Sequence, residues 1–335
     1  MQRITLPPCH PVTLSQKEVP VKSFFVSGLQ SGDDLVNELF LLQDVSRRTT
    51  KNGRPFLLFS AQDNSGSISG VFWDLPDHIA AWVRPGETVL LTGRVNNYKD
   101  TLQLATTDLI QTETTEMADL LPSSQRPQAE MIAELREIIA SLSAPWQELV
   151  GHILLDEAFL PAFANAPAAR QMHHAYIGGV LEHTLSMAAL AEFLANHYPY
   201  VNRDLLLAGT LLHDMGKTAE YDLAGSFRFT EDGRLVGHIV RAIIIIETAA
   251  ADLGTPAAEV QQLVHLVASH HGKLEWGSPV EPKTLESLLL HQIDLLDSRV
   301  QGFLEHAASD VDENGWTVKP SPMFRNEIKR PSAPK

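Results

Sequence analysis

Residues 211–217 read Leu-Leu-His-Asp-Met-Gly-Lys, and this stretch places a histidine and an aspartate at the end of an apolar helical segment. His183 lies on an earlier predicted helix, within Leu-Glu-His-Thr. The same residue types recur later in the chain, at His238, at the pair His270-His271 and at Asp294. Side chains on separate helices can converge in the centre of a bundle and hold metal there. We therefore expect a helical bundle around a metal centre.

The residue types indicate an open catalytic site. Imidazole and carboxylate ligands without sulfur suit Mn, Fe, Co, Ni, Mg or Zn. The chain has one cysteine, Cys9, so a cluster of thiolate ligands is excluded. Seven potential ligands exceed the needs of one ion, and a carboxylate such as Asp214 can bridge two ions about 3.5–4 Å apart. A site with a single ion is the alternative, because His238, His270 and His271 could instead form hydrogen bonds to a phosphate.

Two residues after the His-Asp pair have expected roles of their own. Gly216 would let the backbone turn sharply. Lys217 would supply a cation for a phosphate oxygen or a leaving group. We therefore assign Asp214 and Lys217 as the catalytic residues of the expected site.

The N-terminal half has a different pattern, of short alternating segments separated by turns. A short helix is expected over residues 76–82, before the fourth strand. Five short strands with a helix before the fourth are typical of an OB-fold barrel. The expected strands cover residues 39–45, 54–61, 67–73, 87–96 and 101–110.

These patterns predict a multidomain α+β protein. We expect an OB-fold, nucleic-acid-binding domain over residues 15–115, and a linker with a connecting helix over 116–144. An all-α helical bundle should follow over 145–312, interrupted by a β-hairpin at 227–235 with Asp232-Gly233 at its turn. The proline-rich residues 313–335 read as a flexible tail.

Charge and composition restrict the function classes. The 335 residues hold 26 Lys and Arg against 41 Asp and Glu, a net charge of −15. This balance excludes a protein that coats duplex by bulk electrostatics. Residues 145–312 hold nine basic and 22 acidic residues, so −13 of the charge lies in the expected metal-binding part. No run approaches the roughly 18 apolar residues of a membrane helix, and the start lacks the apolar stretch of a signal peptide. We expect a cytoplasmic protein with no membrane partner.

The two histidine-containing stretches resemble the HD-domain phosphohydrolases. Residues 173–184, His-His-Ala-Tyr-Ile-Gly-Gly-Val-Leu-Glu-His-Thr, and residues 212–217 carry this resemblance. It extends to Gly237-His238-Ile239, to residues 269–272 (Ser-His-His-Gly) and to residues 291–294 (His-Gln-Ile-Asp). Within that superfamily the chain is most similar to the YhaM-type 3′–5′ exoribonucleases. Residues 55–58, 70–74 and 93–95 resemble the OB domain of that family.

The resemblance implies a ligand assignment. By it, His183, His213, Asp214 and Asp294 would hold the first ion. Asp214, His238, His270 and His271 would hold the second. Two divalent ions are expected, with Mn²⁺ preferred and Co²⁺, Fe²⁺, Ni²⁺, Mg²⁺ or Zn²⁺ open. Met215 stands where the family more often has Ile, and both are apolar packing residues.

Further residues are candidates for binding substrate. His173 and His174 could line the pocket or cap the preceding loop, and Arg241 could reach a phosphate or be an ordinary exposed helix residue. Arg47, Arg48 and Lys51 form a basic hairpin tip, which could contact a nucleic-acid backbone or be a solvated loop. Tyr98, at a hairpin tip, is the best candidate for base stacking.

The main hypothesis is a metal-dependent 3′–5′ exoribonuclease that hydrolyses single-stranded RNA, with single-stranded DNA also open, to nucleoside 5′-monophosphates. One alternative is an HD phosphohydrolase of small nucleotides. Another is a single-strand-binding protein without activity. The sequence leaves open whether copies of the chain form a homo-oligomer.

Overall fold

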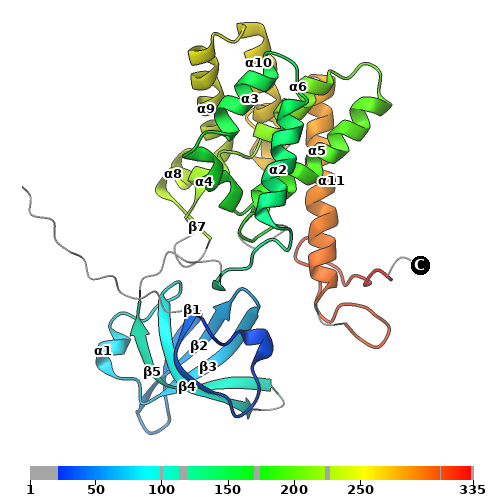
Figure 1. Ribbon diagram of the computed structural model, residues 1–335. Coiled ribbons are helices and arrows are strands. Elements are labelled where there is room, and N and C mark those ends of the chain that lie inside the picture. The colour runs from blue at the N-terminus through cyan, green and yellow to red at the C-terminus, as the bar shows by residue number, and fades with distance from the viewer. Residues whose placement is uncertain are drawn as a thin grey trace, which may run out of the picture.

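The computed structural model describes residues 22–98, 101–112, 119–169, 174–222, 227–309 and 311–332. These residues form a β-barrel followed by a larger helical bundle (Figure 1). No helix within the described ranges is both long and apolar enough to cross a membrane.

The barrel has five strands and is closed. The strands β1 (Asp34–Thr49), β2 (Pro55–Asp63), β3 (Gly66–Trp73), β4 (Thr88–Tyr98) and β5 (Thr101–Gln111) pair in the order β1-β2-β3-β5-β4, and β4 also pairs with β1. The short helix α1 (Asp77–Ala80) precedes β4. The predicted OB-fold barrel is therefore confirmed.

Alternation of buried and exposed side chains gives the barrel its core. Along β2, every second side chain from Leu57 to Asp63 is buried. Phe72 and Trp73 are adjacent in β3, so they point to opposite faces. Phe72 is 5% exposed and belongs to the core, whereas Trp73 is 55% exposed and packs on Phe56, with ring centroids 4.9 Å apart.

The helical bundle is built around one helix that is buried from its third residue onward. Its first helices are α2 (Gln128–Ala140), α3 (Trp146–Leu154), α4 (Phe159–Asn165) and α5 (Gly179–His197). The central helix α6 (Arg203–Leu212) has every side chain from Leu205 to Leu212 buried. The elements after it are α7 (Lys217–Glu220), the strands β6 (Tyr221–Asp222) and β7 (Arg228–Phe229), and the helices α8 (Glu231–Leu235), α9 (His238–Leu253), α10 (Ala257–Ser269) and α11 (Leu285–Ala307).

The predicted hairpin at 227–235 is wrong in its extent. The hairpin is formed by β6 and β7, and Asp232 and Gly233 lie in α8. The Thr230 side chain accepts a hydrogen bond from the Gly233 amide and caps this helix. An N-cap threonine followed by two acidic residues favours a helix start over a turn.

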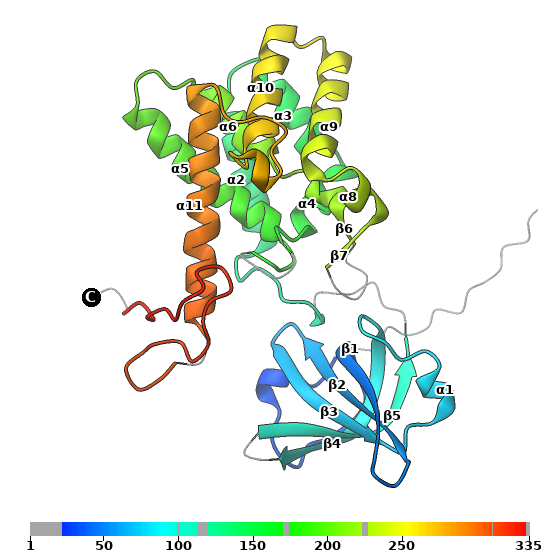
Figure 2. The same ribbon diagram turned by 180° about the vertical axis from the view of Figure 1, so that it is seen from behind.

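The expected connecting helix and the expected flexible tail both pack against the bundle. Helix α2 buries Met131, Leu135 and Ile139 in the bundle core. Residues 311–332 fold back beside the C-terminal half of α11 (Figures 1 and 2). Residues 313–335 were expected to form a flexible tail, but Thr317, Ser321 and Ile328 in this segment are buried.

The barrel and the bundle share a small apolar cluster. Leu39 and Leu41 of β1 pack with Leu120, Leu121 and Phe227. The β1–β2 turn lies at the other end of the barrel, away from the bundle (Figure 2). The barrel thus contacts the bundle at one end and presents its basic turn at the opposite end.

Candidate metal centre

Asp214 lies at the centre of the predicted ligands. It sits in the turn between α6 and α7, directly after His213 at the end of α6. Its Oδ2 lies 3.8 Å from His183 Nε2 and 3.3 Å from His213 Nε2. Its Oδ1 lies 3.7 Å from His238 Nε2 and 3.8 Å from His270 Nε2. One carboxylate therefore faces two separate pairs of imidazoles, one pair at each oxygen.

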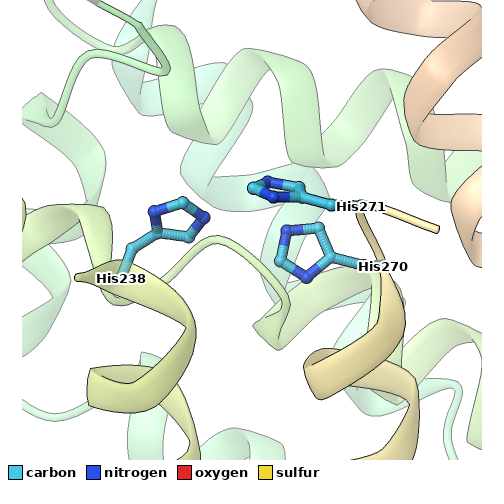
Figure 3. Close-up of side chains that lie close together, drawn as sticks. All are labelled: His238, His270 and His271. Atoms are coloured by element: carbon cyan, nitrogen blue, oxygen red, sulfur yellow. The ribbon is translucent and has the colours of Figure 1, made fainter. Parts of the chain in front are cut away.

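The remaining predicted ligands join these two groups. Asp294 Oδ1 of α11 lies 3.4 Å from His183 Nε2, on the first side. His271 belongs to the second side, where ligand atoms of His238, His270 and His271 lie within 4.8 Å of one another. Figure 3 shows these three rings facing each other from the start of α9 and the end of α10.

Each ring is held by its other nitrogen. The Nδ1 atoms of His213, His270 and His271 lie 2.7–2.9 Å from the backbone carbonyl oxygens of Thr210, Val267 and Trp276. Carbonyls only accept, so these Nδ1 atoms carry the proton and the Nε2 lone pairs point into the site. His238 faces a carboxylate instead of a carbonyl, with Nδ1 3.0 Å from Glu220 Oε2.

The residues fit a divalent cation. Among the described residues, His213 Nε2, His238 Nε2, His270 Nε2 and Asp214 Oδ1 are buried and lack a hydrogen-bond partner. A buried polar atom without a partner costs roughly 1–3 kcal/mol. Donor atoms bound to one ion at about 2.0–2.2 Å lie roughly 3–4 Å apart, as these do. Divalent ions would satisfy all four atoms.

Asp297 contacts the ring nitrogen of His183 that faces away from Asp214, and the sequence did not predict this role. Its Oδ2 lies 2.7 Å from His183 Nδ1 and 3.2 Å from His174 Nε2, and its Oδ1 accepts from Ser186. Carboxylates that hold the far nitrogen of a metal-ligating histidine fix its orientation. Asp297 is one helical turn after Asp294, and this i, i+3 spacing is the only signal in the sequence.

The predicted substrate-binding residues His174 and Arg241 do not line the cavity beside the predicted ligands. His174 is buried behind His183, with Nδ1 2.7 Å from the Tyr176 hydroxyl. Arg241 forms an ion pair with Asp232 of α8. His173 lies outside the described residues. His174 therefore lies where it can support the predicted ligand His183. Arg241 instead links α9 to α8.

Charged neighbours and burial shift the pKa values of several side chains in the candidate metal centre. Burial opposes charge on Asp214 and on Lys217, but their mutual contact, with Nζ 2.6 Å from Oδ2, lowers the pKa of Asp214 and raises that of Lys217. Burial likewise opposes charge on His183, but Asp294 and Asp297 outweigh it and raise its pKa to about 9. Burial and the neighbouring His271 lower the pKa of His270 well below its usual value. His270 is therefore neutral at pH 7, the form that binds metal.

Two glycines let the ligand-bearing segments pack closely. A Cβ on Gly216 would lie 2.1 Å from the backbone oxygen of His238. Gly216 has φ −65, so close approach, and not an unusual turn, requires glycine there. Gly272 follows His271 at φ +81, and a Cβ there would lie 2.2 Å from the ring of His291. His291 Nδ1 in turn contacts the His270 carbonyl at 2.9 Å.

The ligands line a cavity of about 640 Å³. Asp214, His238, His271 and Asp294 form part of its wall, together with Lys217 and Glu220. Its other walls are largely aromatic or apolar and include one further cation, Arg299 of α11; none of these was predicted from sequence. They include Tyr221, Phe229, Trp276, Leu295, Arg299 and Met323.

The barrel carries a second candidate site beside its basic turn. Arg48 pairs with Phe56 across β1 and β2, and Phe56 pairs with Trp73 across β2 and β3. The aromatic pair thus lies next to the predicted basic residues Arg47, Arg48 and Lys51. The Arg47 guanidinium also donates to the Val83 carbonyl. Tyr98 is 54% exposed at the end of β4.

Two family models match the chain. The model of the HD domain matches residues 180–299, which include all seven predicted metal ligands. The model of the OB-fold nucleic acid binding domain matches residues 44–111, within the barrel.

Curated relatives match across both parts. The 3′–5′ exoribonuclease YhaM of a Geobacillus species is 35% identical over 85% of this chain and 88% of its own length. The proteins of the same name from Bacillus velezensis and Bacillus subtilis are 34% and 31% identical, each over 89% of this chain and 95% of its own length. The chain therefore belongs to the YhaM exoribonuclease family and joins an OB-fold domain to an HD domain.

Proposed function

We propose that this protein is a metal-dependent 3′–5′ exoribonuclease that hydrolyses single-stranded RNA to nucleoside 5′-monophosphates. The observation that carries the proposal is Asp214, a buried carboxylate with each oxygen facing its own group of imidazoles. This arrangement suits a bridged pair of ions, the device of many enzymes that cleave phosphodiesters. The names of the curated relatives support RNA as the substrate and 3′–5′ as the direction.

In this proposal, two divalent ions bind to seven side chains. We take Mn²⁺ as the metal, since imidazoles and carboxylates without sulfur suit it, as they also suit Co²⁺, Fe²⁺, Ni²⁺, Mg²⁺ and Zn²⁺. Bound ions would act as Lewis acids on the phosphodiester and activate water. The first ion would use His183, His213, Asp214 and Asp294, and the second Asp214, His238, His270 and His271.

Lys217 and the cavity wall would orient the strand end. Hydrolysis breaks the bond between the last phosphorus and the 3′ oxygen of the shortened strand, which takes up a proton and leaves. The Lys217 ammonium lines the cavity beside Asp214 and would donate to a phosphate oxygen. The aromatic rings of the cavity wall, among them the exposed Trp276, would contact the terminal base.

We further propose that the barrel binds the strand upstream of its 3′ end. The Phe56–Trp73 pair offers a stacking surface, which every base can use. The neighbouring Arg48 and Lys51 would contact phosphates, and the loss of their counterions would make binding salt-dependent. Single-strand binding by an OB fold commonly uses this combination of aromatic and basic residues.

The test compares 5′-labelled single-stranded RNA and DNA in the presence of Mn²⁺, Mg²⁺ or a chelator. We expect stepwise shortening of RNA from its 3′ end, with Mn²⁺ and not with chelator. His183→Ala should abolish shortening. His197→Ala is the matched control, because His197 is exposed on the same helix, and it should retain activity.

Two outcomes would contradict the proposal. If His183→Ala shortens RNA as fast as the wild type, the metal centre is not the active site. If intact RNA remains while dNTPs or cyclic dinucleotides are hydrolysed, the protein is a phosphohydrolase of small nucleotides.

A further inference from the structure

Residues 311–332, the C-terminal strap, contribute to the wall of the catalytic cavity. Met323, at the turn of the strap, lines the cavity together with Asp294, Ser298 and Arg299 of α11. We propose that the strap closes one side of this cavity, so that only a free 3′ end can enter. This proposal rests on the exoribonuclease function proposed above and adds the element that confines cleavage to the strand end.

The strap is fastened to the end of α11. The Arg330 guanidinium donates to the carbonyl oxygens of Ala307 at 2.9 Å and Ser309 at 2.6 Å. The last carbonyls of a helix lack partners within the helix, and a cation there also complements the helix dipole. His306 Nε2 lies 2.9 Å from the Lys319 carbonyl and adds a second attachment.

The strap has its own internal structure. Trp316 and Lys329 pair as an antiparallel bridge, and the Thr317 amide donates to the Ile328 carbonyl at 2.9 Å. The turn between these two arms carries Met323 and Phe324, and Phe324 packs edge-on against Phe303 of α11 with centroids 5.7 Å apart. The two arms therefore hold the turn against α11, beside the metal ligand Asp294.

The chemistry of the wall suits a nuclease that accepts every base. Methionine is flexible and polarizable and carries no strong donor or acceptor, so it can contact any base without selecting one. Arg299 lies beside it, and the described part of the chain offers its guanidinium no ion-pair partner. A phosphate is the group that this cation would bind.

The size of the cavity supports entry of an end and not of a continuous strand. Its volume of about 640 Å³ lies within the roughly 300–1,000 Å³ typical of small-molecule sites. With the strap in place, the terminal nucleotide fills the cavity and the chain cannot continue beyond it. With the strap released, an internal phosphodiester could reach Asp214 and its neighbours.

Circular single-stranded RNA tests the proposal, because it has no 3′ end. We expect the wild-type protein to shorten linear RNA to mononucleotides and to leave the circle intact. Arg330→Ala removes the Arg330 hydrogen bonds to the end of α11 and leaves the His306 contact. It should nick the circle at least about tenfold faster than the wild type, since each lost hydrogen bond shifts the closed fraction several-fold. It should also release products longer than one nucleotide from linear RNA.

Arg325→Ala is the matched control, because it removes the same charge from another exposed arginine of the strap. It should behave as the wild type. Hydrolysis of bis(p-nitrophenyl) phosphate, which needs no cavity wall, should stay within about twofold in Arg330→Ala and shows that the variant is folded. Met323→Ala leaves the strap attached but removes a wall contact, so it should raise the KM for linear RNA.

The results separate this proposal from the proposed function. If the wild type shortens linear RNA but Arg330→Ala spares the circle and still yields only mononucleotides, the strap does not confine cleavage and the inference is overturned. If the wild type fails to shorten linear RNA, the proposed exoribonuclease function itself is wrong.

Discussion

Replacing Asp297 with asparagine should weaken metal binding although Asp297 is not one of the seven proposed ligands. The Asp297 carboxylate accepts from His183 Nδ1 at 2.7 Å and leaves Nε2 as the metal-binding atom. An asparagine amide can donate to Nδ1 instead, which moves the ring proton to Nε2 and blocks the ligand. Loss of such a supporting carboxylate typically costs 10–100-fold in metal affinity, or about 1.4–2.7 kcal/mol.

Calorimetric titration of the metal-free protein with Mn²⁺ measures this effect. Asp297→Asn should bind at least one ion about 10–100-fold more weakly than the wild type. Asp252→Asn, which changes an exposed carboxylate of α9, should bind like the wild type. Wild-type affinity in Asp297→Asn would refute the role of this carboxylate in positioning His183.

Three further perturbations test the metal centre, the barrel surface and the packing of α9. Removal of metal by a chelator should lower the melting temperature, and Mn²⁺ at about 100 times its Kd should restore roughly 2.7 kcal/mol of stability; no shift on adding metal would speak against the site. Trp73→Ala should weaken binding of single-stranded RNA by about 1–3 kcal/mol in a fluorescence titration, whereas Tyr200→Ala, on the bundle surface, should not. Gly216→Ala should displace the start of α9, because its Cβ would lie 2.1 Å from the His238 oxygen, and should reduce nuclease activity; an unchanged rate would contradict this close packing.

The structure brings the seven predicted ligands together, and the sequence could anticipate this because the chemistry of each is visible in its residue type. His213 and Asp214 are neighbours in the chain, and His183 and His238 lie on recognisable helices, so convergence in a bundle could be anticipated. Asp297 and Glu220 could not be assigned in this way. Their role depends on which ring nitrogen they face, and that is set by packing between helices.

The hydrophobic pattern of the sequence also could not show which of two neighbouring side chains faces the core, or which segments without regular structure pack against the rest of the chain. Either Phe72 or Trp73 could have faced the barrel core, because alternation gives two faces but not which one is inside. The proline-rich C-terminal residues have no helical periodicity, yet Arg330 holds them through carbonyls at the end of α11. Such a contact between distant parts of the chain leaves no local signal.

We propose that Asp214 joins two metal ions in one site. The most direct test is the metal content per chain, measured by mass spectrometry on protein purified without chelator and loaded with Mn²⁺. The structure leads us to expect two ions per wild-type chain and loss of both in Asp214→Ala, because one oxygen of this carboxylate faces each group of imidazoles. A single ion in the wild type, or two ions retained in Asp214→Ala, would contradict the account.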